Sequence, residues 1–388
     1  MQNSSLKKLW NHLRTRRKKQ FLILLFLMFV SSLFEVVSVG AILPFLGVLT
    51  APEQVFQHPL MQPMIQFLEL GKPSQLILPL TIFFIVAALL AGSIRLILLY
   101  VMTRLSYATG ADLSIKIYNL TLYQEYETHV SRNSSEVING IISKTSTVIG
   151  SVIMPIINLI SSSILIISIM VALFVIDPTV AISAFIGFGL LYLSIIRYTG
   201  LQLKENSKII ADKSSQMIKS LQEGLGGIRD VLIDGSQQFY SDLYRSADLP
   251  LRRASGNNAF IGGGPRYILE ALGMAFIALL AYAMSQRQGG MANAIPVLGA
   301  LALGAQRLLP ALQQAYASFT SIRGVEASLI DVLSLLEQPM PRYLEQPLSV
   351  SVPFENEIQL KNVSFRYSKD ASLILDNITL SIPKGSRI

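Results

Sequence analysis

The chain has 388 residues, of which 51% are hydrophobic and only 14% are charged, whereas a soluble domain carries about 25% charged residues, so the composition indicates a membrane protein. The net charge of +8 does not indicate binding to nucleic acid, because the basic residues flank apolar stretches instead of forming a patch with interleaved aromatic residues. The absence of cysteine excludes disulfide bonds, cysteine-bound metals and thiol catalysis, and the three histidines are too far apart in the sequence to show a metal-ligand spacing.

The first twenty residues predict a helix that lies in the membrane interface. Leu6, Leu9, Trp10 and Leu13 share one helical face, and lysines and arginines occupy the other faces. The apolar stretch that follows is too long for the core of a signal peptide, and no small-residue cleavage site follows it. We therefore assign residues 1–20 to a cytoplasmic interfacial helix and begin the transmembrane domain, 21–337, at the next residue.

Long apolar stretches predict an all-α membrane domain of six transmembrane helices. The predicted spans are 21–49, 76–103, 148–176, 179–199, 260–284 and 293–312. Polar, helix-compatible sequence that contains no proline follows two of these spans, over 104–128 and 199–225. These two helices are therefore expected to extend well beyond the bilayer into the cytoplasm.

The distribution of lysine and arginine predicts the orientation of the chain. The first twenty residues hold seven of these basic residues, the segment 104–147 holds four and the segment 197–253 holds nine. The other connections hold only Lys72 and Arg287. Both termini and both long polar loops are therefore expected in the cytoplasm, in a plasma membrane that corresponds to the bacterial inner membrane.

The connection between the first two spans has the pattern of a short amphipathic helix. Pro59 can begin this helix, and Gly71 and Pro73 can end it. Two interpretations stay open: a helix in the external interface, or a loop packed on the ends of the spans. The apolar stripe consists of Leu60, Met61, Met64, Ile65 and Leu68.

The composition changes after about residue 337, where a proline-containing linker is predicted over 338–355. Apolar residues then alternate with a period of two through 358–367 and again through 373–382, which is typical of strands. Pro383, Lys384 and Gly385 predict a turn, and residues 386–388 are expected to begin another strand. Residues 356–388 are therefore assigned to a second, soluble domain.

The segments 360–367 (LKNVSFRY) and 375–385 (LDNITLSIPKG) resemble the opening of an ABC ATPase domain. The resemblance implies that the ring of Tyr367 stacks on the adenine of ATP, with Mg²⁺ as the companion ion; the alternative is an ordinary strand tyrosine. The phosphate-binding loop of that family would come after residue 388. We therefore expect a truncated α/β ATPase domain, a chain that does not hydrolyse ATP alone, and a fragment of a longer half-transporter.

The six predicted spans with their cytoplasmic extensions resemble the ABC exporter fold. The resemblance implies a homodimer or a pair of half-transporters embedded in membrane lipid. It also implies short coupling helices that contact the ATPase domains, for which the candidates are 125–136 and 234–242; the alternative is solvated loops. The charged residues of these two candidates are Glu125, Glu127, Arg132, Glu136, Asp234 and Asp242.

Three arginines fall inside or at the edge of predicted spans: Arg95, Arg266 and Arg307. A guanidinium in the bilayer is costly unless it faces a polar cavity or a partner, and it is well shaped to bind phosphate oxygens. These three residues are therefore candidate ligands for an anionic, lipid-linked substrate. The alternative is structural pairing, since Glu270 lies four residues after Arg266 and Glu35 could neutralise another arginine.

The segments 94–96 (IRL), 264–270 (GPRYILE) and 306–310 (QRLLP) are similar to those of PglK-type lipid-linked oligosaccharide flippases. The resemblance implies that the three arginines handle the pyrophosphate of a lipid-linked glycan. The glycines that precede Pro265 depart from the family pattern. The function expected from the sequence is ATP-driven flipping of such a glycan, with a drug or peptide exporter, or a non-transporting fragment, as alternatives.

Overall fold

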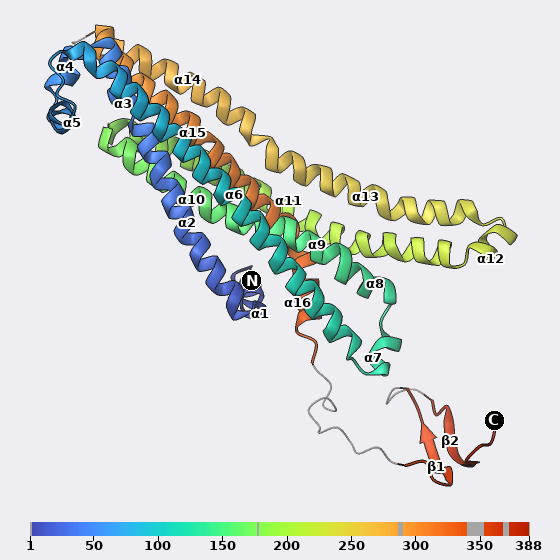
Figure 1. Cartoon of the computed structure of the whole chain (residues 1–388). Coiled ribbons are helices and arrows are strands. Elements are labelled where there is room, and N and C mark those ends of the chain that lie inside the picture. The colour runs from blue at the N-terminus through green and yellow to red at the C-terminus, as the bar shows by residue number, and fades with distance from the viewer. Residues whose placement is uncertain (1, 177, 286–289, 340–352, 368–371, 388) are drawn as a thin grey trace.

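The computed structural model describes residues 2–176, 178–285, 290–339, 353–367 and 372–387 (Figure 1). Long helices run side by side through most of this part of the chain, and two strands follow near its C-terminal end (Figure 1). The long helices are α2 (Thr15–Gly40), α6 (Ile77–Leu122), α10 (Met154–Ile176), α11 (Pro178–Gly226), α13 (Gln237–Gly263), α14 (Pro265–Ser285) and α15 (Gly290–Gly324).

Shorter helices connect or extend the long ones. Two of them, η3 (Gly140–Lys144) and η4 (Ile149–Ile153), are π-helical turns that lead into α10. The others are α1 (Gln2–His12), α3 (Ile42–Thr50), α4 (Pro52–Gln57), η1 (Pro59–Met61), α5 (Gln62–Phe67), η2 (Pro73–Leu76), α7 (Tyr126–Ser131), α8 (Ser134–Asn139), α9 (Thr145–Val148), α12 (Ile228–Ile233) and α16 (Glu326–Leu336).

Three helical stretches among the described residues are long and apolar enough to cross a membrane, namely Thr15–Thr50, Pro73–Leu122 and Ser134–Phe174. They contain almost all of the first three predicted spans. The other three predicted spans lie on α11, α14 and α15, which are helical but include residues outside the described part of the chain. The number of six spans therefore stays a prediction.

The long helices bury polar side chains and expose apolar ones. On α2 the buried residues include Ser31, Ser32 and Glu35, whereas Leu22 and Phe26 are exposed. The same helix would have the opposite pattern in a soluble protein, because a large exposed apolar surface is unfavourable in water. This pattern fits a helix bundle surrounded by lipid, in which polar groups are kept inside.

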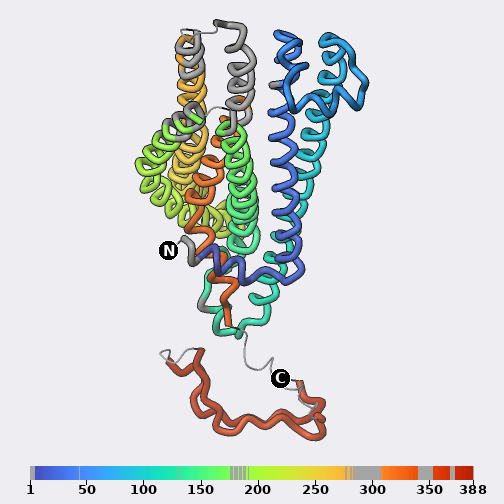
Figure 2. The backbone as a smooth tube through the Cα atoms, turned by 90° about the vertical axis from the view of Figure 1, so that its left-hand side faces the viewer, coloured from blue at the N-terminus to red at the C-terminus, as the bar shows by residue number. Residues whose placement is uncertain are grey.

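Helices α1, α7, α8 and α16 lie at one end of the bundle, and we call this end the polar end (Figure 1). A large core of buried apolar side chains lies towards this end. In this core, Leu9 of α1 packs with side chains of α2, α6, η4 and α16. Helix α1 lies across the ends of the long helices in Figure 2. The apolar stripe predicted for α1 therefore faces the protein through Leu6, Leu9 and Leu13, and only Trp10 of that stripe is exposed.

The short helices α4 and α5 lie at the opposite end of the bundle (Figure 1). Ile65 is buried against Val48 and Leu80, while Leu60 and Leu68 are exposed. The predicted apolar stripe is thus divided between packing on the ends of the long helices and an exposed surface. The packed part agrees with the second interpretation, and the location of the exposed part in the external interface stays a prediction.

The strands β1 (Glu357–Phe365) and β2 (Leu375–Pro383) form an antiparallel hairpin. The turn predicted after Pro383 is present, and Gly385 adopts a φ of 86° there, which favours glycine. The further strand expected from residue 386 is not formed at Ser386 or Arg387, and Ile388 lies outside the described residues. Strand β2 pairs with β1 along one edge, and its other edge is unpaired within the described residues.

Candidate functional site

A cavity of about 830 Å³ opens between α2, α6, α10 and α15. Its wall is rich in hydroxyl and amide groups and also contains one acidic and one basic residue. Such groups can form hydrogen bonds with a polar ligand inside an otherwise apolar bundle. The polar residues that line it are Ser31, Ser32, Glu35, Ser38, Arg95, Asn158, Ser161, Ser162, Gln306 and Gln314.

Helical periodicity brings these polar groups to one place. On α2, Ser31, Glu35 and Ser38 are separated by four and three residues, which places them on one face of the helix. Asn158 and Ser162 are four residues apart on α10, so they also share one face of their helix. These residues were not predicted as a site from the sequence, although the periodicity of polar residues within two apolar spans was a signal that could have found them.

Arg95 and Glu35 form an ion pair in this cavity, with 3.6 Å between the Nη1 and Oε1 atoms. The carboxylate side chain is 4% exposed and the guanidinium side chain is 58% exposed. Arg95 therefore lies at the open edge of the cavity, while Glu35 lies in its wall. The structure brings together a predicted ligand and the carboxylate that was proposed as a possible partner.

Arg266 lies at the start of α14 and forms an ion pair with Glu270 one turn later, with 2.8 Å between Nε and Oε1. The side chain of Arg266 is 61% exposed, and the residue is not part of the cavity wall that contains Arg95. Helix α13 ends at Gly263 and α14 begins at Pro265, one residue before Arg266. The structure thus separates Arg266 from Arg95 within one subunit.

The side chain of Arg307 lies outside the described residues, although its backbone belongs to α15. Two of its neighbours, Gln306 and Pro310, line the cavity. The role predicted for Arg307 therefore stays a prediction.

The first predicted coupling segment forms two short helices. Glu125 precedes α7, Glu127 lies on α7, and Arg132 lies between α7 and α8. Glu136 lies in the first turn of α8. This segment therefore has the expected helical content, divided into two helices by Arg132 and Asn133.

The second predicted coupling segment differs from the expectation. The short helix of this loop is α12, at 228–233, and Asp234 follows its last residue. Gly235 then has a φ of 65° and turns the chain into α13, on which Asp242 lies. Residues 234–236 form the turn and 237–242 begin the long helix α13, so the predicted segment is not a separate short helix.

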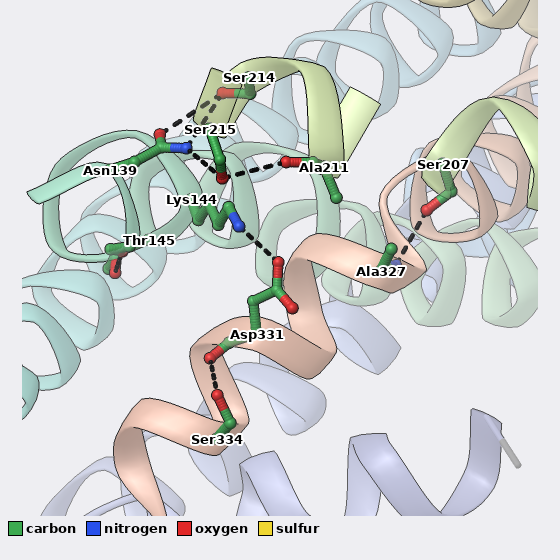
Figure 3. Close-up of polar contacts among 11 residues, drawn as sticks. Asn139, Lys144, Thr145, Ser207, Ala211, Ser214, Ser215, Ala327, Asp331 and Ser334 are labelled. Carbon is green, nitrogen blue, oxygen red and sulfur yellow. Dashed lines mark hydrogen bonds and ion pairs between the residues drawn. The ribbon is translucent and has the colours of Figure 1, made fainter. Parts of the chain in front are cut away.

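Helix α16 is held at the polar end by side chains from several elements. Lys144 of η3 forms an ion pair with Asp331 of α16 at 2.5 Å. The hydroxyl of Ser207, on α11, accepts a hydrogen bond from the backbone amide of Ala327 at 2.9 Å, which satisfies an amide of the first turn of α16 (Figure 3). Because α16 leads into the linker, these contacts fix the position at which the linker begins.

The residues that follow α16 are also held by side chains. Arg132 donates a hydrogen bond to the side chain of Gln338 at 2.8 Å, and Gln124 donates to the carbonyl of Pro339 at 3.1 Å. From α1, Lys8 pairs with Glu337 at 3.1 Å. Side chains of the first polar loop and of the N-terminal helix therefore hold the beginning of the linker in place.

Tyr367 lies just after β1, where its ring is partly exposed. It makes an edge-on contact with Phe365, with 5.0 Å between ring centroids, and a tilted contact with Tyr126 of α7, with 6.2 Å between centroids. The ring is thus available for stacking and lies beside the first coupling segment. Among the described residues, no group of three or more histidine, aspartate or glutamate side chains could hold a metal ion.

Residues 20–293 match the family model for the ABC transporter transmembrane region. The chain belongs to this family. The match covers well over half of the chain, including the helices that line the cavity except most of α15. This membership identifies a membrane protein with the transmembrane region of a transporter. No curated protein matches the chain.

The contacts of α1, which precedes the matched residues, predict a dependence on pH. Burial and the nearby ammonium of Lys116, which donates to His12 Nδ1 at 3.2 Å, lower the pKa of His12 from its usual 6.5. The folded state therefore favours neutral His12. Its stabilising effect is present above the unfolded pKa and is lost as the pH falls through 6.5 towards the lower folded value.

We therefore expect α1 to loosen on acidification from about pH 7.5 to 5.5. Hydrogen exchange of the α1 backbone amides, corrected for the intrinsic effect of pH, would measure this loosening. The variant His12→Gln does not titrate in this range and serves as the control. Equal pH dependence in both proteins would contradict the prediction.

Proposed function

We propose that this chain supplies the membrane domain of an ABC half-transporter that moves a phosphate-bearing, lipid-linked glycan across the plasma membrane. The observation that carries the proposal is the polar cavity with Arg95 at its open edge. Arg95 would bind the phosphate, and the hydroxyl and amide groups of the wall would bind the sugar or the remaining phosphate oxygens. The apolar outer surface of α2 and α6 would leave the lipid part in contact with the bilayer.

Arg266 and Arg307 belong to this proposal through their resemblance to PglK-type flippases. Arg266 is exposed on α14, so a contribution from it to the same cargo would require the partner subunit or another conformation. Its carboxylate partner, Glu270, reduces the positive charge available to an anion. Arg95 is therefore the strongest of the three candidates.

The proposal includes a second membrane domain, as a homodimer or a pair of half-transporters. Helices α11 and α13 lie side by side and project away from the other helices as far as α12 (Figure 1). Leu232 and Ile233 of α12 and Phe239 of α13 are exposed near the end of this projection. Exposed apolar side chains outside the predicted spans favour a protein partner there. Together with the first loop, α12 would transmit movements of the ATPase domains.

ATP with Mg²⁺ would drive the cycle. The hairpin of β1 and β2 exposes apolar residues such as Ile358, Phe365 and Leu380. A two-stranded hairpin is marginally stable alone, so these residues are expected to be covered by a larger domain. Tyr367 would stack on adenine there.

The proposal is tested with the full-length transporter in proteoliposomes. We expect ATPase activity to rise on addition of a polyprenyl-pyrophosphate-linked glycan and to stay at its basal rate with the corresponding glycan-free polyprenol. Arg95→Ala should remove most of the stimulation, and Arg266→Ala and Arg307→Ala should each reduce it. Unchanged transport in all three variants would exclude the anion-binding role.

A drug or peptide exporter is the second candidate. The two ion pairs favour it, because Arg95 and Arg266 each have a carboxylate neighbour in this structure. An exporter of neutral or cationic compounds would need no free arginine in its pathway. Stimulation by apolar drugs, with no response to pyrophosphate-linked lipids, would support this candidate over the first.

A further inference from the structure

Glu35 is an unusual residue for its place in the chain. It lies within the first apolar stretch, is almost completely buried, and lines the cavity between Ser31 and Ser38. An ionisable group in a transmembrane helix is costly and is generally retained for a function. The ion pair of Glu35 with Arg95 indicates what that function is.

The ion pair of Glu35 and Arg95 is looser than the ion pair of Arg17 and Asp112, which also joins α2 to α6. Its Nη1–Oε1 distance is 3.6 Å, whereas Arg17 and Asp112 are separated by 2.8 Å. A distance of 3.6 Å exceeds that of a good hydrogen bond, which is about 2.7–3.2 Å. The pair therefore retains electrostatic attraction without tight hydrogen-bond geometry, and the guanidinium keeps donors available for another anion.

We propose that Glu35 is an exchangeable counter-ion, which holds Arg95 when the cavity is empty and yields it to the anionic group of the cargo. This inference rests on the proposed function and deepens it by naming a residue that governs how the cargo's anionic group is bound and released. A pyrophosphate carries more than one negative charge and therefore attracts the guanidinium more strongly than a single carboxylate does. Glu35 would thus select pyrophosphate over carboxylate headgroups, and it would lower the affinity enough for the cargo to leave.

The bilayer gives this exchange a physical reason. An arginine without a partner is costly at membrane depth, and a carboxylate at hand removes that cost whenever the cargo is absent. The cargo must then compete with Glu35 for Arg95. Removing the charge of Glu35 should therefore tighten binding of an anion, whereas loss of a purely structural ion pair should weaken or not affect it.

The test measures binding of a polyprenyl pyrophosphate to the 388-residue chain in phosphatidylcholine nanodiscs, with the polyprenol of equal length as the neutral probe. We expect Glu35→Gln to lower the Kd for the pyrophosphate by about two- to fivefold, the range for a partly exposed ion pair. Binding of the polyprenol should not change. The gain should vanish in the double variant with Arg95→Gln, because Glu35 acts through Arg95.

Asp112→Asn is the matched control. It removes a carboxylate from another ion pair between α2 and α6, that of Arg17 and Asp112, which is not part of the cavity wall. We expect it to leave the Kd for the pyrophosphate unchanged. A similar tightening in Asp112→Asn would show a general effect of charge and would overturn the inference.

Two further results separate the inference from the proposed function. If the unmodified chain binds the pyrophosphate more tightly than the polyprenol, but Glu35→Gln binds it no more tightly while keeping its thermal midpoint, the counter-ion role is wrong and the cargo class stands. If the unmodified chain does not distinguish the two lipids, the proposed cargo is wrong and the inference fails with it. A gain in Glu35→Gln that persists after Arg95→Gln also overturns the inference.

Discussion

We expect Gly110→Val to cause a severe loss of folded protein. Gly110 lies on the buried face of α6, where an added Cβ would collide with the side chain of Ile149 on η4. The collision involves more than the flexible end of that side chain, so α6 and η4 would have to move apart. Overpacking of this kind costs about 1–3 kcal/mol and occasionally more. The thermal midpoint and the monodisperse fraction in detergent would measure the loss.

Two companion variants isolate the cause of this effect. Gly92→Ala lies on the same helix, and no atom lies within 4 Å of its added Cβ, so its thermal midpoint should be unchanged or slightly higher. Ile149→Ala should partly rescue Gly110→Val, because it removes the colliding atoms. A stable Gly110→Val variant, or equal damage from Gly92→Ala, would contradict the close contact of α6 with η4.

The sequence was sufficient to predict the helices that depend on local composition. Long uncharged stretches predicted the first three spans, because a helix in a bilayer needs about 20 apolar residues. The same reasoning predicted an extension of the second span, and α6 continues through Leu122 as one helix. The ion pair of Arg266 and Glu270 also followed from local spacing, since side chains four residues apart are neighbours on a helix.

Features that depend on distant segments could not be predicted in this way. From the sequence, Glu35 could have neutralised more than one of the three arginines. The packing of α2 on α6 brings it to Arg95. The cavity itself requires four helices to converge, and no one of them reveals it alone. The position of α16 likewise depends on contacts with distant segments, such as the ion pair of Asp331 with Lys144 of η3.

Loss of that ion pair should release α16. Asp331→Ala would leave the ammonium of Lys144, whose side chain is only 11% exposed, without its carboxylate at 2.5 Å. A mostly buried charge that loses its partner costs about 1–3 kcal/mol, because it must be desolvated without compensation. We expect a lower thermal midpoint and faster hydrogen exchange of the α16 backbone amides.

The double variant Lys144→Met with Asp331→Leu decides whether the charge or the packing is responsible. It removes both charges and fills the space with apolar side chains of similar length, which is often neutral for stability. We expect it to recover most of the protection of α16. If it remains as loose as Asp331→Ala, the hydrogen bonds around Ser207 and Gln338 are insufficient to position α16, and the ion pair itself defines the start of the linker. If Asp331→Ala has no effect, the apolar contacts of Leu329 and Val332 hold α16 by themselves.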